Sequence, residues 1–274
     1  MNSNTQSQSY YTHGYDAELS KSHKWRTVEN SCKHFKNLIK PTDVVLDVGC
    51  GPGSITLDLA NYVPNGKVVG IEPTRELIDE CVRNTNKQTN VEFKLASGYN
   101  IPFSDNTFDI VHCHQVLIHL EDPILVLKEM RRVCKPNGIV CCKECDPSMS
   151  AVYPEKHIPA LSSYFTKMKE ANGRLTDQNM GRKLKTLALR SGFHEQDITF
   201  SVDHWCYSTA KDRQLVGERY IERITYSKEQ FDKFDPIADE QLRNSFVDGW
   251  KKWIMDDEAL LVFNHGEVVC LKRT

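Results

Sequence analysis

The stretch VVLDVGCGPGS, residues 44–54, carries the strongest fold signal in this chain. Its first five residues predict a buried strand, and Gly49, Gly51 and Gly53 predict a tight turn into a helix that begins near Ser54. Such a turn lets the backbone approach a ligand closely at the carboxyl end of the strand, where open α/β sheets bind their ligands. We therefore expect a nucleotide-like cofactor at this turn.

Short apolar runs alternate with amphipathic stretches from this point to about residue 146. The runs KVVGIE, VEFKLA, FDIVHC and GIVCCKE predict further buried strands, and RELIDECVRN and PILVLKEMRRVCK predict helices. Asp122 is the expected N-cap of the second helix, with Pro123 in its first turn, and Asn137-Gly138 is expected to end it. The alternation predicts a doubly wound α/β fold with a mostly parallel sheet.

Segments on both sides of this core are expected to cover it. Residues 25–39 show an amphipathic helical pattern, and helices are expected near residues 154–172, 211–224 and 238–255 and over MGRKLKTLALRSGF, with Gly192 as its C-cap. ITFSVDHWCYS resembles a strand, and ALLVFNHGEVVCLK predicts a last strand pair with its turn at Asn264–Gly266. Trp250 and Trp253, three positions apart on an expected helix, are expected to pack inward.

No repeat or low-complexity linker separates these parts, so we predict a single domain over residues 1–274. Its expected parts are an N-terminal cover (1–40), a cofactor-binding core (41–146), a substrate cover with late core elements (147–256) and a C-terminal strand pair (257–274).

Composition and charge narrow the class of protein. The chain is 39% apolar with 35 basic and 37 acidic side chains. No run of about 18 apolar residues could span a membrane, and the first 20 residues are too polar for a signal peptide, so we expect a cytoplasmic protein. A net charge of −2 favours neither nucleic acid nor an anionic membrane, and it suits a small neutral or mixed substrate. Oligomeric state stays open.

The ten cysteines are spread along the chain and are interpreted as reduced thiols. Cys142 and Cys145 match a C-x-x-C spacing, but they lie in an expected buried strand, without a second pair or a histidine to complete a tetrahedral site. We predict no metal site.

The charge at the turn indicates which cofactor it binds. Asp47 lies two residues before the first glycine and would repel a phosphate, and Ser54 replaces the third small residue of a dinucleotide fingerprint. A carboxylate suits a ligand with positive charge and no phosphate, such as the sulfonium and ammonium of S-adenosylmethionine. Glu72 ends the second strand, where a carboxylate can accept hydrogen bonds from both ribose hydroxyls. The cofactor-binding residues predicted here are Asp47, Gly49, Cys50, Gly51, Gly53, Glu72 and Pro73.

Three stretches, DVGCGPGSITLDLA, IPFSDNTFDIVHCHQVLIHLEDP and LKEMRRVCKPNGIV, resemble the successive motifs of class I S-adenosylmethionine-dependent methyltransferases, in particular the branch similar to the ubiquinone and menaquinone biosynthesis enzymes. The opening YTHGYDAELSKSHKWRTVENS and the late HWCYS and LLVFNHGEVVCLK resemble a subgroup of small-molecule methyltransferases from fungi and bacteria. That subgroup includes fungal enzymes that methylate thiols of epidithiodiketopiperazine metabolites.

The resemblance implies a seven-stranded sheet whose last strand is antiparallel, and it assigns further cofactor contacts. It places the adenine at Ala96, Ser97 and Gly98, where Ser97 departs from the family's usual aspartate and is a weaker acceptor. It also implies that the loop with His114 and Gln115 contacts the methionyl part of the cofactor and that the N-terminal cover folds across it.

Within that cover, Tyr15 is the expected aromatic contact to the sulfonium, and Arg26 could pair with the methionyl carboxylate. Trp25 lies on the apolar helix stripe and is expected to pack in the core, and the roles of Tyr11 and His13 stay open between substrate pocket and hinge.

His114 and His119 are the candidate catalytic residues for proton transfer, with packed or hydrogen-bonded histidines as the competing interpretation. Because no acid/base pair is evident, a thiol acceptor is favoured slightly over oxygen or carbon. The main hypothesis is therefore a small-molecule methyltransferase. Its alternatives are a catalytically inactive cofactor-binding regulatory or scaffold protein, a nucleic-acid or protein methyltransferase, and an NAD-dependent oxidoreductase.

Overall fold

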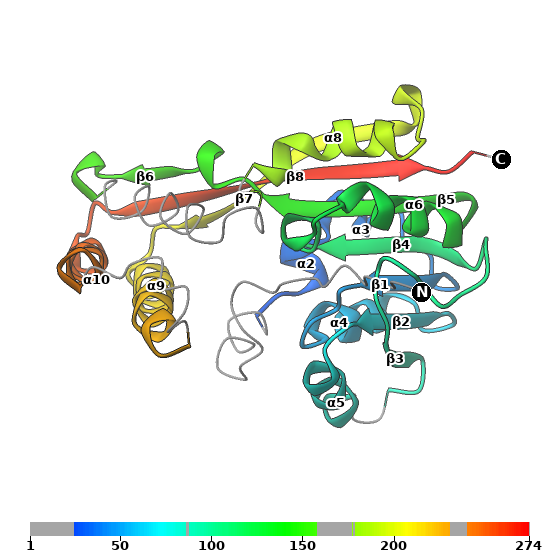
Figure 1. The fold of residues 1–274 in the computed structure, drawn as a ribbon, viewed down its shortest axis with the longest axis horizontal. Coiled ribbons are helices and arrows are strands. Elements are labelled where there is room, and N and C mark those ends of the chain that lie inside the picture. Colours follow the sequence, from blue (N-terminus) through cyan, green and yellow to red (C-terminus); the bar gives the residue numbers. More distant parts are fainter. Residues whose placement is uncertain (1–24, 86–87, 158–176, 178, 231–239, 274) are drawn as a thin grey trace, which may run out of the picture. The chain divides into compact units, whose positions relative to one another are not determined.

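The computed structural model describes residues 25–85, 88–157, 177, 179–230 and 240–273 (Figure 1). The chain divides into two compact units, described separately below: residues 1–144, 180–202 and 266–274 form the first, and residues 145–179 and 203–265 the second. The single-domain organisation and its internal boundaries stay a prediction. None of the helices in the described ranges is long and apolar enough to cross a bilayer.

A sheet whose strands β1 to β5 all pair in parallel forms the centre of the first unit, as the apolar runs predicted. Its order is β3-β2-β1-β4-β5-β8, and β1 pairs in parallel with both β2 and β4 (Figure 1). The strand order therefore reverses at β1, because the chain places β2 and β3 on one side of β1 and β4 and β5 on the other. Such a switch point opens a crevice at the carboxyl ends of the strands. The strands are β1 (Val44–Val48), β2 (Lys67–Glu72), β3 (Val91–Leu95), β4 (Phe108–His114), β5 (Cys134–Cys145) and β8 (Leu260–Leu271).

The doubly wound, mostly parallel α/β class is confirmed. Eight strands are described, one more than the seven that the resemblance implied. The additional strand is the short β6 (Ala151–Tyr153), which pairs with β8, and β7 (Ile198–Tyr207) also pairs with β8.

Helices of the first unit follow the predicted stretches closely. They are α4 (Ser54–Tyr62), α5 (Arg75–Asn84), α6 (Pro123–Val133) and α8 (Met180–Arg190). The Asp122 carboxylate caps α6 by accepting from the amides of Ile124 and Leu125, as predicted. Gly192, at φ +95°, follows α8 in the left-handed conformation that its predicted C-cap role requires.

The predicted helix over residues 25–39 is wrong in its length. Two four-residue helices replace it, α2 (Val28–Ser31) and α3 (Lys33–Lys36). They are separated by Cys32, whose backbone leaves the helical conformation at φ −124° and ψ 18°. Val28, Cys32 and Phe35 of the apolar stripe are nevertheless fully buried, because both short helices place them against the same core, and Ile39 packs against it partly buried. Trp25 is only half-buried and is not part of this core, so its expected core packing is wrong.

Two predicted turns are strand instead. Asn137-Gly138 does not end a helix, since α6 stops at Val133 and this dipeptide lies within β5, where the Asn137 amide and the Gly138 carbonyl bond to the backbone of Lys272. The predicted hairpin at Asn264–Gly266 is likewise wrong, because β8 runs through it without a break. Asn137 keeps a left-handed, turn-like backbone at φ +62° inside β5, where the register with β4 shifts. The Asn264 amide donates to Oγ of Ser150 and its carbonyl accepts from the Asp146 amide, so this backbone is satisfied without a turn.

The second unit packs two helices around aromatic residues. Trp250 stacks on Tyr220 at 4.4 Å between ring centroids, and Trp253 meets Trp250 edge-on. Both tryptophans are buried, which confirms the prediction that they pack inward. The helices are α9 (Ala210–Gln230) and α10 (Glu240–Met255). Of the predicted helix at 154–172, only the 3-10 turn Glu155–His157 lies within the described residues.

Candidate active site

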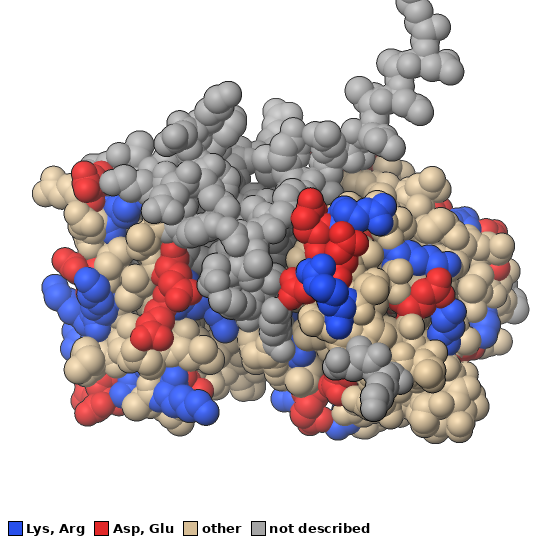
Figure 2. Space-filling model, turned by 90° about the horizontal axis from the view of Figure 1, so that it is seen from below, with Lys and Arg blue, Asp and Glu red and all other residues tan. Residues whose placement is uncertain are grey.

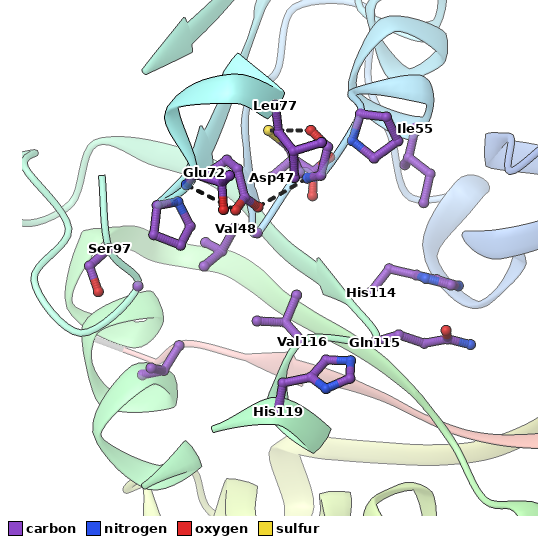
Figure 3. A pocket seen from close by; sticks show the side chains of 18 of the residues that line it. Asp47, Val48, Ile55, Glu72, Leu77, Ser97, His114, Gln115, Val116 and His119 are labelled. Carbon is purple, nitrogen blue, oxygen red and sulfur yellow. Dashed lines mark hydrogen bonds between the residues drawn. The ribbon is translucent and has the colours of Figure 1, made fainter. Parts of the chain in front are cut away.

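A cavity of about 1150 Å³, counted with the solvent at its mouth, opens in the first unit at the carboxyl ends of β1, β2 and β4 (Figure 3). Of the predicted cofactor-binding and catalytic residues, Gly53 and Ala96 do not line it, and Tyr15 lies outside the described residues, as do Tyr11 and His13. The predicted residues that do line it are Arg26, Asp47, Gly49, Cys50, Gly51, Glu72, Pro73, Ser97, Gly98, His114, Gln115 and His119.

The glycine loop is shaped by left-handed backbone at three positions, with φ +71° at Gly49, +53° at Gly51 and +80° at Gly53. At Gly49 a Cβ would lie 2.6 Å from Cγ2 of Val116, so a side chain has no room there. At Gly51 a Cβ would meet no atom within 4 Å, and this part of the backbone is therefore open to a ligand in the cavity. Gly53 is the N-cap of α4, and a Cβ there would lie 2.9 Å from Cys81 and from Phe93, so this glycine faces α5 and β3 and not the cavity.

Glu72 ends β2 with its carboxylate already oriented by the backbone. Its two oxygens accept 3.2 Å hydrogen bonds from the amides of Gly51 and Thr74 (Figure 3). Burial raises its pKa, whereas its hydrogen bonds with Thr74 and Gly51 lower it. Each carboxylate oxygen has a further lone pair, so Glu72 can still accept from a diol in the cavity.

Asp47 is the most deeply buried carboxylate on the cavity wall, at 2% exposure. Burial raises its pKa to about 7, against the lowering effect of a hydrogen bond from Thr56, and the charge of Glu72 adds to the rise. Figure 3 shows Asp47 and Glu72 side by side at one end of the cavity. Two carboxylates so close to each other favour a cation there and disfavour a phosphate.

Arg26 comes to the cavity from the N-terminal segment. Its Nη2 donates a 2.6 Å hydrogen bond to Oε1 of Gln115, which follows β4. The segment is fixed immediately after Arg26, where Thr27 forms a capping box with Asn30 and the Val28 amide donates to Asp58 of α4. Arg26 and Gln115 were both predicted to contact the cofactor. They are 89 positions apart, and no local sequence pattern predicts the hydrogen bond between them.

The two predicted catalytic histidines lie at the end of β4 and in the loop that follows it. His114 is the last residue of β4, and His119 lies in the 3-10 turn Leu117–His119. Figure 3 shows His114 and Gln115 across the cavity from Ser97, with His119 nearer Val116. Both histidines line the cavity and can therefore face a bound molecule.

Ser97 is oriented by its neighbours at the end of β3. Its Oγ accepts from the Tyr99 amide at 3.2 Å, and Gly98 fits between Val48 and Val126, which a Cβ would approach to 3.1 Å. Ala96 does not line the cavity, and its amide donates to the Glu72 carbonyl at 3.1 Å, which holds the end of β3 against β2.

Several cavity residues were not predicted. Thr74, Leu77, Tyr99, Leu120 and Val126 add apolar and hydroxyl surface to the wall. Leu77 and Val126 lie in the first turns of α5 and α6, so a helical wheel drawn for the start of each helix could have indicated them. Glu144 does not line the cavity, but its carboxylate accepts from the Val116 and Leu117 amides in the loop after β4. No local sequence pattern predicts these hydrogen bonds.

No group of three potential metal-ligating side chains occurs among the residues that the structure describes. All ten cysteines are free thiols, and Cys141 and Cys142 are buried in β5 as its predicted strand character requires.

The chain matches a known family over most of this unit. The methyltransferase domain family matches residues 39–199. An uncharacterized methyltransferase of Schizosaccharomyces pombe is 37% identical, with 97% of this chain and 98% of that protein covered. A demethylmenaquinone methyltransferase of Staphylococcus aureus is 35% identical over 46% of this chain and 55% of its own length.

Solved structures share the fold. Phosphoethanolamine N-methyltransferase 2 of Haemonchus contortus, crystallised with phosphomonomethylethanolamine and S-adenosylhomocysteine, superposes with a TM-score of 0.55 at 17% identity, covering 97% of this chain and 58% of that one.

Proposed function

The chain belongs to the methyltransferase domain family, and we propose that it transfers a methyl group from S-adenosylmethionine to a small-molecule acceptor, with a thiol favoured over oxygen or carbon. Family membership identifies it as an enzyme and leaves the alternative of a catalytically inactive subunit without support. A cytoplasmic location stays part of the proposal.

One observation carries the choice of cofactor: two buried carboxylates, Asp47 and Glu72, line the same end of the cavity beside an open stretch of glycine backbone at the sheet's switch point. S-adenosylmethionine has the matching chemistry, because it combines a ribose diol with two positive charges and carries no phosphate. Glu72 suits the ribose of either cofactor, but NAD and other dinucleotides would set a diphosphate against Asp47, so we reject the oxidoreductase alternative.

The proposed assignment distributes the cofactor along the cavity. Glu72 would accept from the ribose hydroxyls, the backbone around Ser97 would receive the adenine, and Arg26 would pair with the methionyl carboxylate. Asp47 would favour the positively charged methionyl end. When bound, this cofactor supplies a methyl group on a positively charged sulfur, and the protein's task is to align the acceptor and to exclude water.

The acceptor would occupy the end of the cavity near His114 and His119. A thiol ionises near pH 8.5 and needs little help from a base, whereas an alcohol needs a strong one. Among the described residues that line the cavity, Asp47 and Glu72 are the carboxylates, and both belong to the proposed cofactor end. Histidine alone is sufficient for a thiol or an acidic oxygen, and this supports the order of preference.

Surface charge supports a small acceptor over nucleic acid. Figure 2 shows Lys and Arg side chains intermixed with Asp and Glu on the face in view. Such mixed charge is unlike the basic patch with which proteins bind nucleic acids.

Two experiments test the proposal. Titration calorimetry with S-adenosylmethionine and S-adenosylhomocysteine is expected to show binding of both, and absence of heat with either ligand would refute the cofactor assignment. An assay with a labelled methyl group over a panel of thiols, phenols, quinols and sterols is expected to give label transfer to a small molecule, fastest with a thiol. Transfer to phenols or quinols alone would contradict the thiol preference.

A further inference from the structure

Glu144 lies at the end of β5 and connects that strand to the loop after β4. It is fully buried, and its carboxylate accepts hydrogen bonds from three successive backbone amides. Oε1 accepts from Val116 at 2.9 Å and from Leu117 at 2.7 Å, and Oε2 accepts from Ile118 at 3.4 Å. One side chain therefore provides the acceptor for the three backbone amides at the start of the 3-10 turn Leu117–His119.

The loop that Glu144 holds forms one wall of the cavity, through Gln115, Val116, His119 and Leu120. It begins in a costly conformation, since Gln115 has φ +55°, which non-glycine residues rarely adopt. The Gln115 amide donates to the Lys143 carbonyl at 2.8 Å. Two consecutive residues of β5 thus hold four consecutive residues of the loop.

The loop's position matters to the rest of the site. The close approach of Val116 to Gly49 joins the loop to the glycine turn, and Gln115 accepts from Arg26. A displaced loop would therefore move the glycine turn, the arginine and His119 together.

A carboxylate at position 144 is costly to bury. Burying a carboxylate costs several kcal/mol of desolvation, and the hydrogen bonds only offset that cost. An apolar side chain would avoid the cost, but it could not accept from three amides. Burial raises the pKa of Glu144 to about 7, while the amides of Leu117, Val116 and Ile118 and the charge of Arg26 lower it. The carboxylate therefore lies, despite its desolvation cost, beside the loop whose backbone forms this wall of the cavity.

We propose that Glu144 is a positioning residue of the methyl-transfer site, whose carboxylate holds residues 115–118 in the conformation that binds the cofactor. The inference rests on the proposed function, because the loop's role is defined by the cofactor cavity. It assigns no contact between Glu144 and the cofactor or the acceptor. Its effect is to order the cavity wall before the ligand arrives, so that binding does not have to order it.

Three variants of the full chain test the inference. Glu144→Ala removes all three acceptor bonds, and Glu144→Gln keeps one oxygen for Val116 and Leu117. Asp197→Asn is the matched control, since Asp197 is also a buried carboxylate, accepts from Arg273 at 2.7 Å and does not line the cavity. Each variant is measured for thermal stability, for S-adenosylhomocysteine affinity by calorimetry, and for hydrogen exchange of amides 116–118 by NMR in the free protein.

We expect Glu144→Ala to weaken S-adenosylhomocysteine binding about tenfold or more and to speed exchange of the three amides, because a buried network loses its acceptor. Glu144→Gln should restore affinity to within about threefold of the original protein, since its oxygen still accepts. Asp197→Asn should lose stability and keep its affinity. If Glu144→Ala does not fold, Glu144→Gln must still show faster exchange of the Ile118 amide, together with an affinity that is measurably weaker than that of the original protein, by up to about threefold.

The inference is overturned if both Glu144 variants bind S-adenosylhomocysteine like the original protein. It is also overturned if Asp197→Asn loses as much affinity as Glu144→Ala at an equal loss of stability, since affinity would then follow stability alone. If the original protein does not bind S-adenosylhomocysteine, the proposed cofactor fails. The exchange of amides 116–118 then decides separately whether Glu144 holds the loop.

Discussion

The Thr56 hydroxyl, one turn into α4, donates a 2.7 Å hydrogen bond to the carboxylate of Asp47 at the end of β1. This bond lowers the pKa of a carboxyl group that burial raises to about 7. The charge of Asp47 therefore changes in the physiological pH range, and the strength with which the cavity attracts a cation changes with it.

Cofactor affinity should depend on pH through Asp47. A bound cation favours the ionised carboxylate, so affinity for S-adenosylmethionine should rise as pH increases through about 7. Thr56→Val removes the hydrogen bond and should move this midpoint to higher pH, while Asp47→Asn should abolish the dependence. Calorimetry between pH 5.5 and 8.5 in two buffers checks both, and a Thr56→Val profile identical to that of the original protein would exclude Asp47 as its source.

Stability of the ligand-free protein should show the opposite trend. Because the folded pKa of Asp47 is raised from 3.8 to about 7, the folded protein keeps a proton that the unfolded chain has lost, and stability falls as pH rises across this window. Asp47→Asn should then stabilise the free protein at pH 8 by on the order of 2 to 4 kcal/mol. Urea unfolding at pH 5 and pH 8 measures the difference, and a destabilised variant at pH 8 would contradict it.

Glu72→Ala should weaken S-adenosylhomocysteine binding by about 1 to 3 kcal/mol, since it removes acceptors for the ribose and also the anchors of the Gly51 and Thr74 amides. Glu76→Ala is the control, because Glu76 is an exposed acid in the first turn of α5 that does not line the cavity. Calorimetry should find its affinity unchanged. Equal losses in the two variants would mean that general charge, and not ribose binding, is responsible.

Gly49→Ala should destabilise the protein by about 2 to 4 kcal/mol, because it combines a strained left-handed backbone with a clash against Val116. Val116→Ala in the same chain should recover part of this loss by removing the clash. A double-mutant cycle from urea unfolding should give a favourable coupling of about 1 to 2 kcal/mol. Strictly additive effects would show that the two side chains do not meet.

Glu267 should make stability fall in acid. Burial raises its pKa, but the ion pairs with His34 at 3.2 Å and with Lys143 at 3.1 Å outweigh this and lower it to about 2. Its contribution is therefore complete above the unfolded pKa of 4.5 and is lost as pH falls through about 2. Compared with Glu267→Gln in urea, the original protein should lose about 3 kcal/mol more between pH 5 and pH 2. Parallel pH profiles of the two proteins would contradict this.

His114→Ala and His119→Ala separate proton transfer from packing once the assay panel has supplied an acceptor. A histidine that moves a proton should cost about 10² to 10⁴ in kcat and remove one limb of the pH profile. A histidine that only packs should change KM or stability and leave that limb in place. Steady-state kinetics from pH 5.5 to 9 distinguish the two, and wild-type turnover in both variants would exclude a catalytic role for either residue.

The local features of this protein were determined by its sequence. Strand and helix periods, the Asp122 cap, the glycine turn and the placement of Asp47 and Glu72 at strand ends all depend on residues within a few turns of each other. Their backbone preferences and apolar spacing therefore fix them before the chain folds. The class of cofactor follows from the same short stretch, because its charge and its backbone shape lie side by side in the chain.

Only the tertiary structure decided which distant side chains meet. Arg26 reaches Gln115 over 89 positions, and Glu144 reaches the amides of Val116 to Ile118 over 26 to 28. It also turned the Asn264–Gly266 segment from an expected turn into continuous strand. These outcomes depend on sheet order and register, where a shift of one residue reverses the face of every side chain, and no local period encodes that register.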